Sequence, residues 1–427
     1  MIEKKISSGS ARTVKKFKLN TDQLEIGMFV CELDCPWEDT DFLMQGFTID
    51  SQRDIKVLQA RCRFVYVEIV DEKCIEIEKR ATGSPVTIKK RISSEKVNLK
   101  KQRPLESEIQ QASHSYVGAK KAVQSFMGEV IRNKSIDIQE ARAVVSDCMG
   151  SVSRNPDAMM LLSQLKNKDE YTSQHSLNVC LYSLMLGQRM GLAGHELETV
   201  GLCGMLHDMG KLRTPIEVLN KPGKLTDEEF QEIKRHPVHG REILLSSEKT
   251  VDQEVVDAAY MHHERLRGGG YPEGLTEVSI SFHTRIVTIA DVYDAITSAR
   301  VYDGSRSHLE ATRILTENRG KEFDEDMVIR FIAGLGLYPP GSFLEMTNGE
   351  VAIVLENHST SRLMPKLLRV MGADKTLTEE RIIDLADEPR DEAGQRYAVA
   401  SVLPQEAYGV SLKAYYQRGL FANISHL

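Results

Sequence analysis

The segment His207-Asp208-Met209-Gly210-Lys211 holds three side chains that could do chemistry together. Imidazole nitrogen and carboxylate oxygen suit a borderline first-row metal ion. Neighbouring side chains on a helix point about 100° apart, so His207 and Asp208 could face one small volume in a pocket wall. Lys211, one turn further along the face of His207, could then reach a phosphate held by that metal. One such pair is weak evidence, because most His-Asp pairs bind nothing.

Further metal-type ligands recur on both sides of this pair. Five of the 12 histidines form a series with a later aspartate, and these five all lie between positions 175 and 263: His175, His207, His236, His262, His263 and Asp291. A lone histidine such as His175 is more often a satisfied core residue, and a helix-start histidine such as His236 is unremarkable. Two adjacent imidazoles would be costly to bury unpaired. A carboxylate in the apolar stretch around Asp291 needs a cation or strong donors.

Together with Asp208 the candidate ligands number seven, which exceeds the need of one four-coordinate ion. They fit two metal ions that share a bridging carboxylate. Such a pair can hold a hydroxide between the ions and clamp a phosphate for in-line displacement. The pattern therefore predicts a dinuclear site suited to phosphate chemistry.

Length and charge set the frame for this site. The 427 residues are enough for two or three domains. A hydrophobic share of 41% and a charged share of 27% are ordinary for a globular protein. The formal net charge of −7 argues against nonspecific binding of DNA or RNA. The segment 79–103 carries a local charge of +8, and because it has few large apolar residues we interpret it as a solvated linker.

The seven cysteines are odd in number and irregularly spaced, which favours reduced thiols in a cytosol. The charged segment 1–18 has no apolar core and does not resemble a signal peptide. No run of 18 apolar residues predicts a membrane span. We therefore expect a cytoplasmic protein without a membrane partner.

Hydrophobic periodicity predicts the elements that position the ligands. Residues 17–70 alternate between strand and helix patterns, with strands at 27–33 and 64–70 and a helix at 54–60. Trp37, the one tryptophan, is best interpreted as a packing residue. Helices are predicted throughout 105–165 and at 171–190, 196–207, 251–263 and 286–300, followed by a strand at 349–356. The glycines at 268–270 predict a loop that no helix could continue through.

Residues 171 to about 342 resemble the HD-GYP domain, a family of cyclic di-GMP phosphodiesterases in the HD hydrolase superfamily. The resemblance rests on six motifs in order: Tyr171-Thr-x-x-His175-Ser-x-Asn-Val, His207-Asp208-x-Gly210-Lys211, His236-Pro-x-x-Gly240, His262-His263-Glu264, Gly270-Tyr271-Pro272 and Asp291-Val-Tyr-Asp294-Ala-x-Thr-Ser-x-Arg300. Residues 17–70, with Gly27-Met28 and Pro36-Trp37, also resemble the domain of unknown function that precedes some HD-GYP domains.

The resemblance implies an HD-type helical bundle core. Together with the sequence patterns on either side of it, this predicts a mainly α fold with a small N-terminal α/β domain and a small β-containing C-terminal extension. The boundaries expected are a tail at 1–15, the α/β domain at 16–75, a basic linker at 76–104, a helical connector at 105–165, the HD-GYP catalytic domain at 166–345 and the extension at 346–427.

The family's site residues transfer to matching positions of this chain. The implied metal ligands are His175, His207, Asp208, His236, His262, His263 and Asp291, with Asp208 bridging two divalent ions, usually iron or manganese. Lys211 would bind the scissile phosphate, and Gly270, Tyr271 and Arg300 would hold the nucleotide, the arginine by a bidentate phosphate contact. A bridging hydroxide would cut cyclic di-GMP to pGpG, with further cleavage to GMP left open.

Three positions depart from the family's pattern. Tyr171 stands where some members place a glutamate for a third metal, which is why we expect two ions. Arg267 stands where Asp or Asn is usual, and Asp303 where a basic residue is common, which puts substrate affinity in doubt more than the chemistry.

Two other classes of function remain as alternatives. One is a cyclic di-GMP receptor with slow or no turnover that passes a signal to protein partners; retention of all seven ligands argues against it. The other is an HD phosphohydrolase of a different nucleotide, against which the intact Gly270-Tyr271-Pro272 and Arg300 argue. A homodimer and signalling protein partners are further expectations, as is regulation by motion of the N-terminal domain across the basic linker.

Overall fold

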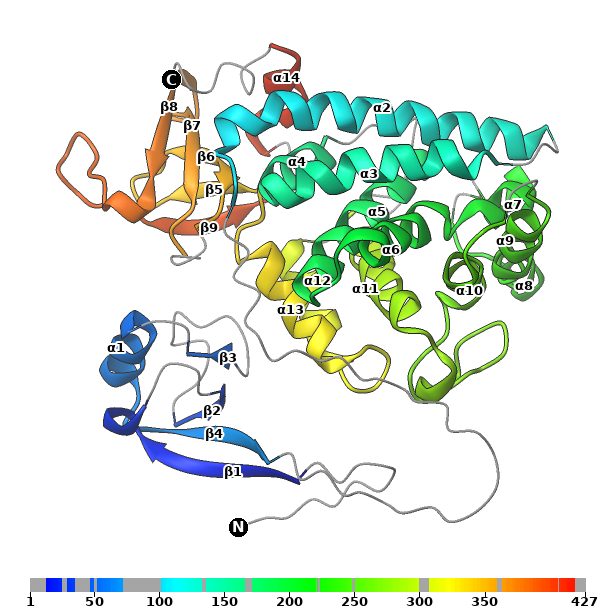
Figure 1. Cartoon of the computed structure of the whole chain (residues 1–427). Coiled ribbons are helices and arrows are strands. Elements are labelled where there is room, and N and C mark those ends of the chain that lie inside the picture. Colours follow the sequence, from blue (N-terminus) through cyan, green and yellow to red (C-terminus); the bar gives the residue numbers. More distant parts are fainter. Residues whose placement is uncertain are drawn as a thin grey trace. The chain divides into compact units, whose positions relative to one another are not determined.

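The structure is a computed structural model that describes most of the chain. The described residues are 13–24, 29–34, 47–49, 52–71, 101–132, 136–165, 171–219, 221, 223–247, 250–298, 307–358, 363–405 and 407–418. Contacts divide the chain into two compact units, Met1–Ile92 and Ser93–Leu427 (Figure 1). Trp37, Arg300, Asp303 and the predicted linker as far as residue 100 lie outside the described residues.

The first unit is a small α/β structure. Its antiparallel sheet has the strand order β1-β4-β2-β3. The bounds are β1 Thr13–Asn20, η1 Thr21–Gln23, β2 Phe29–Leu33, β3 Phe47–Thr48, α1 Gln52–Arg61 and β4 Phe64–Asp71. Ile55 and Leu58, one turn apart on α1, share a buried cluster with Val65 and Val67, which alternate along β4. The strands and the helix predicted here are confirmed.

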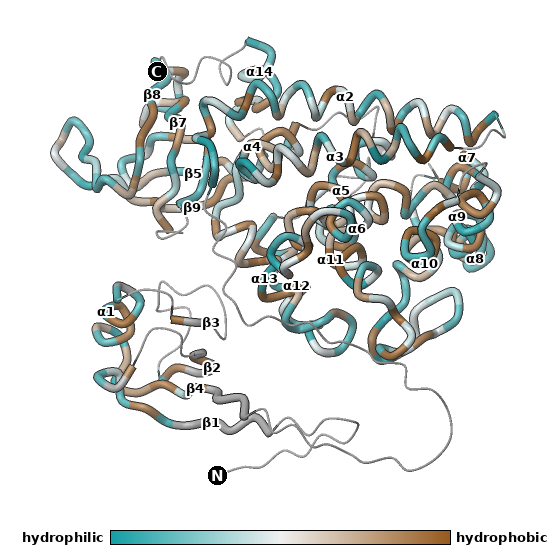
Figure 2. The backbone as a smooth tube through the Cα atoms, in the orientation of Figure 1, coloured by the Kyte–Doolittle hydropathy of each residue, from teal (hydrophilic) through white to brown (hydrophobic). Residues whose placement is uncertain are grey.

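The second unit is mainly helical. Its elements as far as the C-terminal sheet are α2 Leu105–Ile131, α3 Ile138–Arg154, α4 Pro156–Ser163, α5 Tyr171–Arg189, α6 Gly194–Leu206, η4 Met209–Arg213, α7 Ile216–Leu219, α8 Asp227–Ile233, α9 His236–Leu245, α10 Gln253–Met261, η5 Glu277–Ser279, α11 Phe282–Thr297, α12 His308–Glu317 and α13 Glu325–Leu335. Hydrophobic and hydrophilic residues alternate along α2 (Figure 2), as expected of a helix with one side packed against its neighbours. Among the described residues, no helix is long and apolar enough to cross a membrane.

Helices α5 and α6 form the centre of this unit, and glycine lets them approach closely. A Cβ added at Gly204 would lie 2.9 Å from the backbone of Cys180 on α5. At Gly201 it would lie 2.5 Å from the side chain of Val145 on α3. Helix α5 lies among the other helices of this unit (Figure 1). Its side chains are buried along most of its length, and it carries His175. The first predicted ligand therefore sits on an element that has little freedom to shift.

A five-stranded antiparallel sheet follows, in the order β8-β7-β6-β5-β9. The bounds are β5 Phe343–Met346, β6 Val351–Glu356, β7 Lys366–Met371, β8 Leu377–Asp384, η6 Leu385–Asp387, β9 Val399–Leu403, η7 Ala407–Gly409 and α14 Leu412–Gln417. The Lys101 ammonium, from the end of the predicted linker, contacts Asp157 at 2.8 Å and Glu356 at 3.2 Å. These ion pairs join the start of α4 and the end of β6 to the segment that leads into α2.

Candidate metal centre

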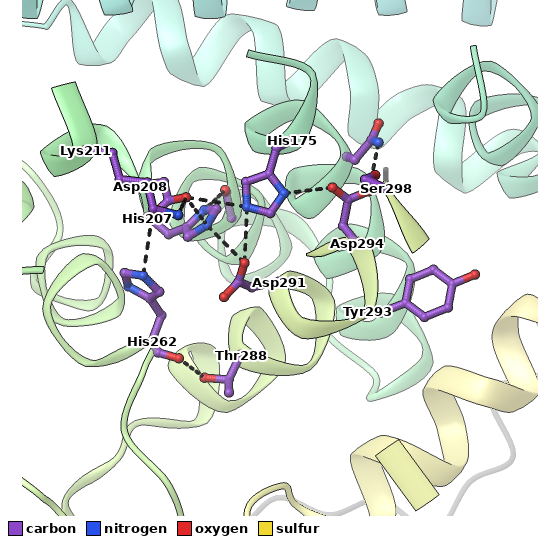
Figure 3. A network of polar contacts seen from close by, with 12 residues as sticks. His175, His207, Asp208, Lys211, His262, Thr288, Asp291, Tyr293, Asp294 and Ser298 are labelled. Carbon is purple, nitrogen blue, oxygen red and sulfur yellow. Dashed lines mark hydrogen bonds and ion pairs between the residues drawn. The ribbon is translucent and has the colours of Figure 1, made fainter. Parts of the chain in front are cut away.

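The predicted ligands come from five places on the helical unit and meet in one buried centre. Figure 3 labels His175, His207, Asp208, His262 and Asp291 of this set. His175 lies in the first turns of α5, and Asp291 lies in the middle of α11. His207 caps the C-terminus of α6, with Asp208 next to it. His236 is the first residue of α9, and His262 caps α10 immediately before His263. The structure thus brings together all seven residues that the sequence predicted.

Backbone and carboxylate acceptors orient four of the imidazole rings. Nδ1 of His207 donates to the Gly204 carbonyl at 2.7 Å, and Nδ1 of His236 donates to the Ile233 carbonyl at 2.7 Å. Nδ1 of His262 donates to backbone carbonyls of the preceding helical turn, and Nδ1 of His175 donates to the Asp294 carboxylate. With Nδ1 protonated, a neutral ring presents the lone pair of Nε2. Second-shell acceptors of this kind fix the tautomer of metal-binding histidines.

Asp208 lies between the rings and divides them into two sets. Its Oδ2 atom lies 3.4 Å from Nε2 of both His175 and His207. Its Oδ1 atom lies 3.3 Å from Nε2 of His236 and 3.6 Å from Nε2 of His262. The two oxygens of one carboxylate therefore face different pairs of imidazoles. Figure 3 shows Asp208 among His175, His207 and His262. Each set has the donor types and spacing that could hold a metal ion, and Asp208 belongs to both.

Asp291 adds a second carboxylate to the centre. Its Oδ1 atom lies 3.1 Å from His175 Nε2 and 3.7 Å from His207 Nε2, while Oδ2 lies 4.0 Å from Nδ1 of His263. The first set thereby gains an anionic donor, and His263 completes the second. The aspartate that the sequence placed in an apolar stretch of helix has a buried polar environment after all.

The centre fits a cation on two independent observations. Nε2 of His207 and Oδ1 of Asp208 are buried without a hydrogen-bond partner in the part of the chain that the structure describes. In addition, Nε2 of His236 lies 3.1 Å from Nε2 of His262. If both rings donate through Nδ1, two lone pairs face one another at this distance. A cation among these atoms removes both penalties.

Charge in the centre is unevenly distributed. Burial disfavours a charged Asp208, but Lys211 and His207 outweigh it and hold the pKa of Asp208 well below its usual range. Burial also opposes protonation of His207, yet the Asp208 and Asp291 carboxylates raise its pKa to about 9. In the second ligand set, burial lowers the pKa of His236 to about 3. The carboxylates therefore stay ionised, and at least one ring is neutral and ready to act as a ligand.

The local backbone corrects one expectation about this segment. We predicted a helix that ends at His207 and expected Lys211 one α-helical turn further along the face of His207. Instead α6 ends at Leu206, and Met209–Arg213 forms the 3-10 helix η4. The Lys211 ammonium consequently pairs with Asp208, three residues back. The lysine does lie at the centre, but through a tighter turn than an α-helix.

Glycine at position 210 explains how α9 reaches the centre. A Cβ added at Gly210 would lie 1.9 Å from the His236 carbonyl oxygen and 2.5 Å from the Gly240 nitrogen. Residues with a side chain cannot approach backbone this closely. Gly210 therefore allows η4 to lie directly against the start of α9, which places His236 beside Asp208.

The remaining predicted site residues lie next to this centre or outside the described residues. The Tyr271 ring stacks on His263 with ring centroids 4.7 Å apart, and Gly270 packs against the backbone that follows His263. Arg267 is exposed and donates to the Gly320 carbonyl at 3.0 Å, which fixes a loop. The position of Arg300 is not described.

Sequence reasoning missed the function of two polar residues behind His175. Asp294 Oδ2 accepts from His175 Nδ1 at 2.7 Å, and its Oδ1 accepts from Asn178 at 2.9 Å (Figure 3). All three side chains are buried. A signal was available, because Asp294 follows Asp291 by three residues and Asn178 follows His175 by three, so each pair shares a helix face.

A helical core that gathers histidines and aspartates around one His-Asp pair defines the HD-domain class. A family model described as HD domain matches residues 159–327, and a second, described as a domain of unknown function (DUF3391), matches residues 16–141. A cyclic di-GMP phosphodiesterase of Pseudomonas aeruginosa is 35% identical over 399 residues, which cover 92% of this chain and 93% of that protein. The chain belongs to the HD-GYP family, with a DUF3391 domain in front of its HD domain.

Two further relatives match shorter stretches of this chain. A 3'3'-cGAMP-specific phosphodiesterase of Vibrio cholerae is 41% identical over 159 residues, which cover 37% of this chain and 36% of that protein. A cyclic di-GMP phosphodiesterase response regulator of Xanthomonas campestris pv. campestris is 40% identical over 150 residues, which cover 35% of this chain and 40% of that protein.

Proposed function

We propose that this protein is a metal-dependent phosphodiesterase that hydrolyses cyclic di-GMP to pGpG, with GMP as the product of any second cut. The observation that carries the proposal is the pair of ligand sets that share Asp208. A relative that matches almost the whole chain is named a cyclic di-GMP phosphodiesterase, which supports the choice of substrate.

Two divalent ions, iron or manganese, are proposed as the cofactor. His175, His207 and Asp291 would hold one ion, and His236, His262 and His263 the other, with one Asp208 oxygen on each. Imidazole and carboxylate donors suit both metals. When bound, the ions lower the pKa of a bound water and neutralise charge on the phosphate.

The chain's own groups would position the substrate. The Lys211 ammonium is held at the centre by Asp208, and an incoming phosphate oxygen offers it a second anionic partner. Asp208 thus acts both as a shared ligand and as the group that keeps Lys211 in place. Gly270, Tyr271 and Arg300 would hold the nucleotide. The centre is buried on the side of α5 and α6 and more open at His263, so substrate would enter past His263 and Tyr271.

A second substrate is favoured by one specific observation. The 41% identical relative from Vibrio cholerae is named for 3'3'-cGAMP, a related cyclic dinucleotide. Its match spans 159 residues of this chain. The candidate metal ligands would act on the phosphate and therefore do not choose between the two substrates. A receptor without turnover remains the weaker alternative, because the full ligand set is present.

Regulation and assembly complete the proposal. The domain at 16–75 would sense a signal and act on the catalytic domain at 166–345 through the basic linker at 76–104 and the helical connector at 105–165. Glu356 of the extension at 346–427 pairs with Lys101 at the end of the linker, and Lys101 also pairs with Asp157 of the connector. A cytoplasmic location, a homodimer and signalling protein partners are proposed with it. If removal of residues 1–105 leaves the kinetics unchanged, the proposed regulation by the N-terminal domain is wrong.

Turnover by purified protein tests the proposed activity. The protein is prepared without air, loaded with iron or manganese, and incubated separately with cyclic di-GMP and with 3'3'-cGAMP. We expect linear pGpG from cyclic di-GMP and at least tenfold lower kcat/KM for 3'3'-cGAMP. Asp208→Ala should give no product from either. Bound cyclic di-GMP without product in the metal-loaded protein would instead support the receptor.

A further inference from the structure

Glu264 follows the two adjacent histidines, but its carboxylate turns away from the metal centre. The residue is 2% exposed. Oε1 accepts backbone N–H groups from Glu273 at 2.7 Å and Gly274 at 3.0 Å, and Oε2 accepts that of Leu275 at 2.8 Å. Three consecutive amides of one loop therefore converge on a single buried carboxylate. With both oxygens engaged in this way, Glu264 is not available as a metal ligand or as a general base.

The loop that Glu264 holds is intrinsically costly to order. Gly268, Gly269 and Gly274 have φ values of 83°, 81° and 70°, in the left-handed region that glycine adopts readily. A glycine-rich segment loses more conformational entropy on ordering than other segments do. Hydrogen bonds to a charged acceptor are stronger than those to a neutral one, and three of them oppose this cost. The carboxylate can therefore decide whether the loop has one conformation.

The same loop carries Tyr271 onto a metal-type ligand. The Tyr271 N–H donates to the His263 carbonyl at 3.3 Å, and the two rings stack at an interplanar angle of 27°. Gly270 permits this fold: a Cβ there would lie 2.5 Å from the Cα of Glu264. The Lys234 ammonium lies 5.4 Å from the centre of the Tyr271 ring, close enough for a cation–π contact. The ring thus has a fixed place between His263 and the helix end at Lys234.

We propose that Glu264 is a positioning residue that locks the 268–275 loop, so that Tyr271 is held against His263 before the substrate arrives. The inference rests on the proposed function for its substrate, since the loop would contact the nucleotide and not the scissile bond. A preformed loop lowers the entropic cost of binding a large, rigid cyclic dinucleotide. A small diester that never reaches the loop gains much less from it.

The decisive variant is Glu264→Gln, with Glu273→Gln as its matched control. Glutamine keeps the shape but replaces one acceptor oxygen with an NH2 group that faces a backbone N–H. The control makes the same chemical change in the same loop. The Glu273 side chain is exposed and contacts Tyr260, and only the Glu273 backbone N–H bonds to the Glu264 carboxylate.

The first readout is amide hydrogen exchange of the peptide that contains residues 273–275 in the full-length protein. We expect at least tenfold faster exchange in Glu264→Gln and no change in Glu273→Gln. The second readout compares two substrates of the metal-loaded protein. Glu264→Gln should lose at least tenfold more of its kcat/KM for cyclic di-GMP than for bis(p-nitrophenyl) phosphate, mostly through KM, with unchanged metal content.

Three results would overturn the proposal: unchanged exchange in Glu264→Gln, equal losses for both substrates, or a loss of bound metal. If the unsubstituted protein does not turn over cyclic di-GMP, the proposed function fails, and hydrogen exchange still decides whether Glu264 locks the loop. Should Glu264→Gln not fold, Glu264→Asp keeps the charge but withdraws it by one methylene. It should then show an intermediate increase in exchange, and an unchanged rate would overturn the proposal.

Discussion

Replacement of Asp294 by asparagine should weaken metal binding although Asp294 is not itself a predicted ligand. In the native chain Oδ2 accepts from His175 Nδ1, while Oδ1 accepts from Asn178 and from Ser298 at 3.2 Å. An amide can satisfy only one side. If its oxygen stays with Asn178 and Ser298, its NH2 faces His175 Nδ1. The ring must then carry its proton on Nε2, the atom that faces Asp208 and Asp291.

If the amide flips, His175 keeps its acceptor but two other hydrogen bonds are lost in a buried site, at a cost of about 1–3 kcal/mol. Either outcome corresponds to a loss of about 10–100-fold in metal affinity, the range typical of such supporting residues. The assay is calorimetric titration of metal-free protein with manganese. Ser298→Ala is the control, because it removes one donor and leaves the carboxylate on His175; its affinity should change less than threefold. Unchanged manganese affinity in Asp294→Asn would refute this reasoning.

Two further predictions concern stability. Lys101→Met leaves the Asp157 and Glu356 carboxylates without their shared cation and should lower the free energy of unfolding by about 2–3 kcal/mol. The unfolding temperature should fall, whereas the control Lys121→Met at an exposed site should leave it unchanged. Equal unfolding temperatures for the two variants would contradict this prediction. His308 accepts from the Tyr293 hydroxyl and donates to a backbone carbonyl, and burial lowers its pKa from 6.5 to about 4. The unfolded chain therefore binds the proton first, so this contribution is complete above pH 6.5 and is lost as the pH falls to 4, by at most about 3 kcal/mol. Thermal unfolding at pH 7 and pH 5 should show a smaller acid-induced loss in His308→Gln, and an equal or larger loss would be against it.

Spacing alone predicted the helices well, because their apolar residues recur with the period that packing requires. The predicted helix at 171–190 is α5 at Tyr171–Arg189, and the one at 251–263 is α10 at Gln253–Met261. The donor types also indicated a metal centre before any geometry was known. What spacing could not supply is how separate helices meet. The contact of Gly210 with the His236 backbone joins segments 26 residues apart and is invisible in either segment alone.

The turn after α6 is a second feature that the local pattern did not predict. The predicted helix at 196–207 ends within one residue of α6, but Lys211 was expected one α-helical turn beyond His207 on the same face. The chain nevertheless tightens after Leu206, because the close approach at Gly210 and the ion pair between Lys211 and Asp208 favour η4. Here tertiary contacts outweigh helix propensity. Glu264 is a further example of a contact that the local sequence does not reveal. The adjacent histidines suggested metal chemistry, yet the hydrogen-bond donors to Glu264 lie nine to eleven residues later in the chain.

The central claim is that Asp208 is shared by two metal ions. Metal content per chain, measured by mass spectrometry on protein prepared without air and freed of loosely bound ions, tests it most directly. The account predicts two ions per chain in the unsubstituted protein and at most one in Asp208→Ala, with circular dichroism showing that the variant remains folded. One ion or none in the unsubstituted protein, or two ions retained by Asp208→Ala, would contradict it.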